Sequence, residues 1–388
     1  MRSAATYDVI VIGVGGMGSA ACAALAQRGK RVLGLERFDI PHAMGSSHGV
    51  NRIIRLAYYE DPSYVPLLRR AYELWRELES GFGEQLLYIT GSIDASDRDG
   101  EIFRDSLKSC EIHNLPHEIL TSKQLRDRFP AYHLPENHLA LLQPEGGFLA
   151  SERCIVANVV SAIEEGARIH AREAVQTWRT TTSGVRVETD RGVHEAELLV
   201  ISAGAWAGEL IPELALLAQP ERQVLAWLQP GLPELFCPDR FPVFNVTVEE
   251  GRYYGFPIYS IPGFKVGRYH HLQEHVDPDT MEREPNDVDE AMLRTFAGRY
   301  FPGSDGPTMA LKACMFTNSP DEHFIIDVLP RASNVLLVSP CSGHGFKFCS
   351  VIGEIVADLV STGSTDHDIS LFKLDRFAED INQPSPAP

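Results

Sequence analysis

A glycine-rich turn near the N-terminus restricts the fold of this chain more than any other feature. A β-branched run, Tyr7–Ile12, leads into Gly13-Val-Gly-Gly-Met-Gly18, and the helix-like segment Ser19–Arg28 precedes a second apolar run that ends at Glu36. The positions of Gly13, Gly15 and Gly18 are typical of a strand that turns tightly into a helix whose free N–H groups face a pyrophosphate. Glu36 stands where a carboxylate accepts a hydrogen bond from an adenosine ribose. This order favours a dinucleotide-binding unit over a purely structural turn.

Later segments repeat the pattern of a strand followed by a turn of small residues. The run His194–Ile201 leads to Ala203 and Gly204, and Val335–Val338 leads to Gly343 and Gly345. Bulky side chains at such turns would block the approach of a cofactor to the backbone. Apolar spacing predicts helices over 64–78, 151–166 and 348–359, and a strand over 185–189. The stretch 83–140 gives no clear motif, and 220–311 is rich in proline and aromatic residues.

These segments predict an α/β protein of two domains. The first is a Rossmann-like dinucleotide-binding domain assembled from the discontinuous segments 1–84, 145–218 and 318–388. The second is a mixed-sheet substrate domain from 85–144 and 219–317. A length of 388 residues agrees with two domains, at roughly 150 residues each.

Charge and cysteine content exclude several classes of protein. The formal net charge of −18 repels phosphate backbones and anionic lipids, which argues against nucleic-acid and membrane partners. No apolar run is long enough to span a membrane, and no signal-peptide pattern is present. The seven cysteines form no CxxC pair, so we expect free thiols, a cytoplasmic protein and no metal site.

Four further stretches identify a specific family. They are Ser46-Ser-His-Gly-Val-Asn-Arg-Ile-Ile-Arg-Leu-Ala-Tyr58, Tyr254-Gly-Phe-Pro257 with Lys265, Ala313-Cys-Met-Phe-Thr-Asn-Ser-Pro-Asp-Glu-His-Phe-Ile-Ile-Asp327, and Ser342-Gly-His-Gly-Phe-Lys-Phe348. Together with the glycine turn, they resemble the monomeric sarcosine oxidase and N-methyltryptophan oxidase family over nearly the whole chain. The resemblance implies a monomeric FAD enzyme that oxidises a secondary N-methyl amino acid to an imine. The imine hydrolyses to formaldehyde and the primary amino acid, and O2 is reduced to H2O2.

The resemblance also implies how the flavin is held. Cys314 matches the cysteine that family members bond to the flavin 8α-methyl carbon, and His48 matches a histidine implicated in that attachment. The thiolate is the nucleophilic form of cysteine, so a basic environment around Cys314 would fit this role. The alternative is a buried, inert thiol.

The family pattern assigns four basic residues to two jobs. Arg55 and Lys347 match the pair that holds the substrate carboxylate, with plain surface charge as the alternative. A carboxylate in a pocket with little water must be paired, and a guanidinium and an ammonium would satisfy its oxygens. Arg52 and Lys265 match residues at the opposite flavin face, where a fixed ammonium would stabilise superoxide as it forms from O2.

Two aromatic positions match the substrate side. Tyr254 matches a family tyrosine, although it could equally line a strand. His270 matches a family histidine only if one extra residue is allowed after Lys265, so Tyr269 and His271 compete with it.

Three positions depart from the sarcosine oxidase pattern. Phe316 replaces a tyrosine two residues after the flavin-linking cysteine, and Pro340 and Cys341 replace a glycine and an aromatic residue. These changes would suit a larger or cyclic substrate, such as a pipecolate-like or proline-like ring, N-methyltryptophan or a fructosyl amino acid. A flavin dehydrogenase with another electron acceptor, a regulatory nucleotide-binding protein and an NAD dehydrogenase stay open as weaker alternatives.

Overall fold

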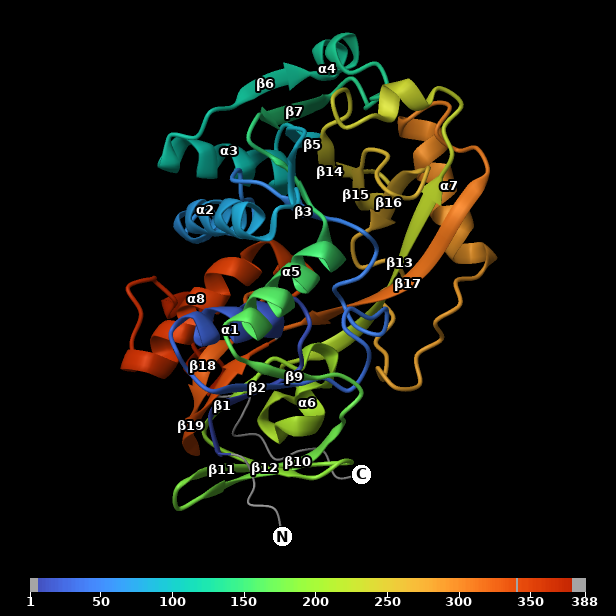
Figure 1. Ribbon diagram of the computed structural model, residues 1–388. Coiled ribbons are helices and arrows are strands. Elements are labelled where there is room, and N and C mark those ends of the chain that lie inside the picture. Colours follow the sequence, from blue (N-terminus) through green and yellow to red (C-terminus); the bar gives the residue numbers. More distant parts are fainter. Residues whose placement is uncertain (1–5, 340, 379–388) are drawn as a thin grey trace.

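The computed structural model describes residues 6–339 and 341–378, and it contains two large sheets (Figure 1). The first sheet has eight strands, with a path β10-β11-β12-β1-β2-β9 and with β19 and β18 added beside β12. Their bounds are β1 (Thr6–Ile12), β2 (Val32–Leu35), β9 (Arg168–His170), β10 (Val175–Thr181), β11 (Gly184–Thr189), β12 (Val193–Ile201), β18 (Ile326–Leu329) and β19 (Ala332–Val338). The strands β9, β2, β1, β12 and β19 run parallel.

Helices cover the first sheet because its central strands are apolar on both faces. Val9 and Val11 of β1 pack in one core with α1 (Gly16–Gln27), α5 (Ser151–Glu164) and α8 (Cys349–Thr362). Ile10 and Ile12 pack on the other face with Ile211, which follows α6 (Ala207–Leu210). In Figure 1, α1, α5 and α8 lie on the side of this sheet that faces the second sheet. A parallel sheet buried on both faces is the arrangement that places ligands at the carboxyl ends of its strands.

The second sheet also has eight strands, in the order β17-β13-β16-β15-β14-β5-β7-β6, and it is mixed. Its strands are β5 (Ser92–Asp97), β6 (Glu118–Thr121), β7 (His138–Gln143), β13 (Gln219–Leu228), β14 (Val243–Val248), β15 (Gly251–Phe256), β16 (Phe264–Arg268) and β17 (Thr308–Asn318). Among the described strands of this second sheet, only β14 and β5 pair in parallel, and the other pairs are antiparallel. The helix α7 (Asp287–Tyr300) packs against β13 and β16, and α3 (Glu101–His113) packs against β5.

A small third sheet and a long helix complete the architecture. The third sheet pairs β3 (Arg52–Ile54), β8 (Gly147–Leu149) and β4 (Leu87–Ile89). The long helix α2 (Tyr64–Phe82) contacts α8, and the shorter α4 (Ser122–Arg128) contacts β6. In Figure 1, the long strands β13 and β17 run from the region of the first sheet up into the second. Residues on β17 therefore reach both regions.

The strands and helices expected from the sequence are confirmed, with small shifts at their ends. α1 begins at Gly16 rather than Ser19, because the last two glycines of the motif already lie in the helix. The helix after Pro62 runs to Phe82, four residues past the expected end. The division into two domains at the expected boundaries stays a prediction. Among the described residues, no helix has the length and apolar character of a membrane span.

Candidate active site

A large cavity opens where β1 turns into α1. It encloses about 1440 Å³ of space free of protein atoms, part of it open to solvent. Gly13 and Gly15 line it, and so do Ala203, Gly204 and Gly343. Thus most of the small residues expected at the turns meet at one place.

The glycine loop leaves room for a ligand. A Cβ on Gly15 would meet only Ser47 Oγ, 3.9 Å away, so any side chain there would project into the open space. Gly13 has a φ of +86°, and a Cβ on it would lie 2.6 Å from the Ser202 carbonyl oxygen. Gly18 and Gly345 do not line the cavity; added Cβ atoms there would clash with Gly13 O at 1.8 Å and with Cys341 Cβ at 2.4 Å. Gly18 and Gly345 therefore allow close packing behind the cavity wall.

Glu36 closes the far end of this cavity. Its carboxylate accepts hydrogen bonds from the backbone N–H of Val14 at 2.8 Å and of Phe38 at 3.0 Å. Because an ionised carboxylate offers about four acceptor sites, it can still accept from a ribose hydroxyl. The α1 N-terminus, the glycine cradle and Glu36 together fit an FAD.

Glu173 also lines this cavity, and its carboxylate accepts hydrogen bonds from two imidazoles. His170 Nδ1 lies 2.8 Å and His194 Nε2 lies 2.7 Å from its two carboxylate oxygens. The three possible metal-ligand atoms lie within 4.8 Å of one another. These hydrogen bonds give Glu173, His170 and His194 a structural role, because they join β9, β12 and the loop before β10.

Cys314 has the environment expected of a reactive thiol. It is buried on β17 and lines a second, smaller cavity that adjoins the first at Arg52, Phe316 and Gly343. Burial raises the pKa of the Cys314 thiol, but the neighbouring His48 and Arg52 outweigh this effect and lower the pKa to about 6. Arg52 Nη2 lies 3.6 Å from the sulfur. A thiol with this pKa is largely ionised at neutral pH.

The remaining cysteines contrast with Cys314. All seven lie in the described part of the chain and are free. Burial raises the pKa of Cys341 to about 12, and it raises the pKa values of Cys22, Cys110, Cys154 and Cys349 as well. Cys314 is thus chemically distinct from these five thiols.

His48 and Lys265 lie close to the Cys314 thiol but differ in their hydrogen bonding. His48 is buried, and its Nε2 has no hydrogen-bond partner among the described residues, which leaves it available to a cofactor. Lys265 Nζ donates to Gly49 O, Asn51 O and Asn51 Oδ1 at 2.8–2.9 Å. It lines neither cavity of the described chain, but it lies 4.2 Å from the ring of Phe256, which lines the second one.

Arg55 and Lys347 come together in the second cavity, so they are not surface charges. Both are almost fully buried, at 2% and 5% exposure. Arg55 Nη2 donates to both oxygens of Glu60 at 2.8 and 3.0 Å, and Lys347 Nζ donates to His344 O at 2.8 Å. Burial and the nearby Arg55 lower the pKa of Lys347 to about 7. Beside the permanent cations Arg52 and Arg55, the cavity therefore holds one cation, Lys347, whose charge titrates near neutral pH.

Two acids balance this charge. Arg55 Nε lies 3.8 Å from Asp94, which is fully buried. Burial raises the pKa of Glu60, but Arg55 outweighs it and lowers the value to about 2; burial raises the pKa of Asp94. Arg55 is thereby held in place before any substrate arrives.

On the substrate side, the structure separates Tyr254 and Tyr269 from His270. Tyr254 and Tyr269 line the second cavity. His270 does not; its ring lies between Glu221 Oε2 at 2.7 Å and Glu322 Oε1 at 3.1 Å. His271 is buried against Asp289. Tyr269 therefore occupies the position in the cavity that the sequence left open among three residues.

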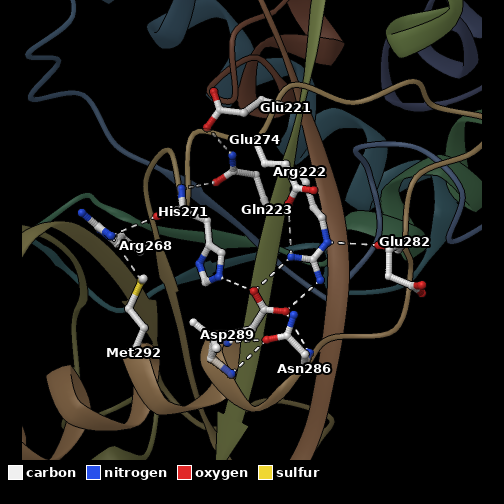
Figure 2. A network of polar contacts seen from close by, with 11 residues as sticks. Glu221, Arg222, Gln223, Arg268, His271, Glu274, Glu282, Asn286, Asp289 and Met292 are labelled. Carbon is white, nitrogen blue, oxygen red and sulfur yellow. Dashed lines mark hydrogen bonds and ion pairs between the residues drawn. The ribbon is translucent and has the colours of Figure 1, made fainter.

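A buried polar network fixes the segment that carries Tyr269, and Figure 2 shows it from close by. Asp289, at the start of α7, accepts from Arg222 Nη1 and Nη2 at 3.0 and 2.8 Å and from His271 Nε2 at 2.8 Å. Asn286 and Asp289 also form a capping box at the N-terminus of α7. The network ties the segment after β16 to β13 and to α7.

Two of the three departures from the family pattern line the cavities, and one of them lies where the two cavities meet. Phe316 lines both, and Cys341 lines the first. Pro340 lies outside the described residues.

Sequence reasoning missed several polar residues in or beside the second cavity, among them Glu60, Asp94 and Arg252. Arg252 could have been found from the two-residue spacing of Arg252, Tyr254 and Phe256 in a strand. Glu60 and Asp94 carry no local signal, because long-range contacts make them partners of Arg55.

Comparison with known proteins places this site in a family. The family described as FAD dependent oxidoreductase (DAO) matches residues 8–359. The chain is 42% identical to a monomeric sarcosine oxidase of Bacillus sp. (strain NS-129), with 96% of this chain and 97% of the relative covered. It is 36% identical to the N-methyl-L-tryptophan oxidase of Yersinia pestis (strain Pestoides F), with 96% and 99% covered.

Solved structures of amino acid oxidases share the fold of this chain. The open form of NikD, described as an unusual amino acid oxidase essential for nikkomycin biosynthesis, matches with a TM-score of 0.84 at 25% identity, over 95% of this chain and 97% of that one. This match confirms the α/β two-domain fold expected from the sequence. The chain therefore belongs to the FAD-dependent oxidoreductase family, within the flavin-dependent amine oxidases that include the monomeric sarcosine and N-methyltryptophan oxidases.

Proposed function

We propose that the protein oxidises a secondary N-methyl amino acid to an imine, with O2 reduced to H2O2. The imine then hydrolyses to formaldehyde and the primary amino acid. The observation that carries the proposal is the buried pair Arg55 and Lys347, which lines a cavity adjoining the dinucleotide cavity. A buried pair of cations is suited to an anionic group, and the α-carboxylate of an amino acid supplies one.

The same cations favour the reactive form of the amine. An ammonium has no lone pair to give up, so the substrate nitrogen must be neutral before it is oxidised. Positive charge on Arg55 and Lys347 disfavours a further cation nearby and so promotes loss of this proton. Tyr254 forms part of the wall beside this position.

FAD, when bound, accepts the electrons of the amine and passes them to O2. The glycine loop, the α1 N-terminus and Glu36 would hold its adenosine and pyrophosphate groups. Lys265, whose three donors are already fixed by Gly49 and Asn51, and Arg52 would present positive charge to the O2 that is reduced.

We further propose that Cys314 bonds covalently to the flavin 8α-methyl carbon. Forming this bond would be a two-electron oxidation: the thiol would give up its proton and the methyl carbon a hydrogen, and O2 would accept both hydrogens and the two electrons as H2O2. Support comes from the lowered pKa of Cys314 and from its position near the unpartnered Nε2 of His48.

Acid precipitation tests this bond. The wild-type pellet should stay yellow, and Cys314→Ala should release its flavin into the supernatant. Cys341→Ala is the matched control, because Cys341 also lines the cofactor cavity, and its pellet should stay yellow. A colourless wild-type pellet would overturn the proposed bond.

The reaction itself is tested by anaerobic mixing. Sarcosine, other N-methyl amino acids, proline and pipecolate are added in turn, and bleaching of the flavin absorbance reports oxidation of the amine. Readmission of air should restore the colour and form one H2O2 for each amine oxidised. Failure of every amine to bleach the flavin would refute the proposed function, and bleaching without peroxide would indicate a different electron acceptor.

Other properties stay proposals of the same kind. We propose a cytoplasmic location, which the seven free thiols support because a reducing compartment keeps them unpaired. We also propose that the protein acts as a monomer, as the names of its sarcosine oxidase relatives state for those proteins.

A further inference from the structure

Arg252 lies directly behind residues that line the substrate cavity, although it does not line the cavity itself. Side chains two apart on a strand point to the same face of a sheet, so Arg252, Tyr254 and Phe256 of β15 share one face. Tyr254 and Phe256 line the second cavity. Tyr253, between them, is buried in the core on the opposite face. Arg252 therefore lies on the face of β15 that borders the cavity, two residues from Tyr254.

Two tyrosines of the cavity hold the Arg252 guanidinium. Its central carbon lies 4.4 Å from the ring centre of Tyr59 and 3.8 Å from that of Tyr269, and its Nη2 donates to the Tyr59 hydroxyl. Both rings line the second cavity. Stacking of this kind fixes the orientation of a guanidinium while leaving its charge unbalanced.

Arg252 forms no ion pair with a carboxylate within residues 6–339 and 341–378, whereas Arg55 has both Glu60 and Asp94 within 4.0 Å. The charges of Glu60 and Glu322 act on Arg252 only from farther away. The Arg252 Nε is buried and has no hydrogen-bond partner among the described residues. An unpaired buried donor on a cation carries an energetic cost that an anionic ligand would remove.

The spacing of the two arginines defines the shape of that ligand. The Arg55 guanidinium carbon lies 4.0 Å from the centre of the same Tyr59 ring. Both guanidinium carbons therefore lie close to one ring, Tyr59. Their separation cannot exceed their two distances from its centre added together. An amino acid whose α-carboxylate meets Arg55 and Lys347 could place a second carboxylate, two or three carbons away, beside Arg252.

We infer that Arg252 is a second anion site of the substrate cavity and that the preferred substrate is an N-methyl amino acid with an acidic side chain. This inference rests on the proposed function, which supplies the reaction. Arg252 would determine substrate specificity, because it would bind the side chain of the substrate and lies away from the bond that is oxidised.

Matched substrates test this selectivity. The kcat/KM for N-methyl-L-glutamate should exceed that for N-methyl-L-glutamine, its neutral isostere, by at least about tenfold, which corresponds to 1.4 kcal/mol. Arg252→Gln should lower this ratio to near one, and Arg252→Lys should retain part of it. Arg179→Gln, which removes an exposed charge on β10 of the other large sheet, should keep the wild-type ratio. Equal kcat/KM values in the wild type, or an unchanged ratio in Arg252→Gln, would overturn the inference.

A binding measurement separates this inference from the reaction. Glutarate and butyrate differ by one carboxylate and carry no amine, and their dissociation constants follow from perturbation of the flavin absorbance. Glutarate should bind at least about tenfold more tightly than butyrate in the wild type but not in Arg252→Gln. Such selectivity without bleaching by any amine would refute the proposed reaction and keep the anion site. Bleaching by sarcosine without any preference for glutarate would refute the anion site alone.

Discussion

At the scale of single residues, the second cavity combines charges that cannot change with one that can. Arg55 stays protonated at any accessible pH, and its charge is balanced by Glu60 and Asp94. Lys347 is different, because burial and Arg55 lower its pKa to about 7. Cys314 also has a pKa near neutrality, but under the proposed bond to the flavin it would not titrate. The affinity of the cavity for a carboxylate should therefore depend on the protonation of Lys347.

Binding of an amine-free carboxylate tests this dependence. Below pH 7 the Lys347 ammonium is charged and attracts butyrate; above pH 7 it is neutral, so the dissociation constant should rise with pH, by up to about tenfold per pH unit. Lys347→Gln should bind weakly at low pH and show little change between pH 6 and 8, and Lys373→Gln, on the surface, should behave as wild type. A wild-type dissociation constant that is constant over this range would contradict the prediction.

The residues of this cavity also show how far the sequence alone could go. Arg55, Lys347 and Tyr254 were predictable because each lies within a short motif that matches a family pattern. Their partners were not, because Glu60, Asp94 and Arg252 meet them through folding. Only the fold shows that Tyr269, rather than His270, lines the cavity, since the extra residue after β16 leaves the register open.

At the scale of elements, the network around Asp289 links three of them. Arg222 is on β13, His271 follows β16, and Asp289 is in the first turn of α7. Burial raises the pKa of Asp289, but Arg222 and its other donors outweigh this and lower the pKa to about 2. The carboxylate is therefore ionised above that pH and depends on Arg222 for compensation.

Removal of Arg222 should destabilise the second sheet strongly. Arg222→Met leaves the buried Asp289 charge with fewer partners, and we expect a loss of about 3–5 kcal/mol in the free energy of unfolding. The exposed pair of Arg299 and Glu250 provides the control, and Arg299→Met should cost no more than about 1 kcal/mol. Urea unfolding followed by tryptophan fluorescence measures both. Equal midpoints for Arg222→Met and wild type would show that the network contributes little.

Elements differed in how well local sequence predicted them. The strand, turn and helix at the N-terminus were readable because glycine spacing and apolar runs are local signals. β5 was not, because its sequence Ser-Ile-Asp-Ala-Ser-Asp looks like a loop, although five of its six residues are buried. Its Asp94 is satisfied by Ser106, Asn245 and Arg55, which no local pattern reveals.

At the scale of the whole molecule, charge is distributed unevenly between surface and interior. The chain carries a net charge of −18, yet Arg55, Arg252, Lys265 and Lys347 gather around the two adjoining cavities. An acidic exterior keeps such a protein in solution, while the field inside the site is set by nearby groups in a medium of low dielectric constant. The overall charge therefore does not predict the charge of the substrate.

The order of strands in the first sheet also determines when the protein can acquire its cofactor. β1 pairs with β12, and β12 pairs with β19, which ends at Val338. Contacts this distant in sequence form late, because a long loop must close first. A nascent chain that has emerged only as far as β17 lacks the last parallel strand and the turn at Gly343. We therefore expect flavin uptake to follow synthesis of nearly the entire polypeptide, and a chain truncated before residue 338 to purify without flavin absorbance.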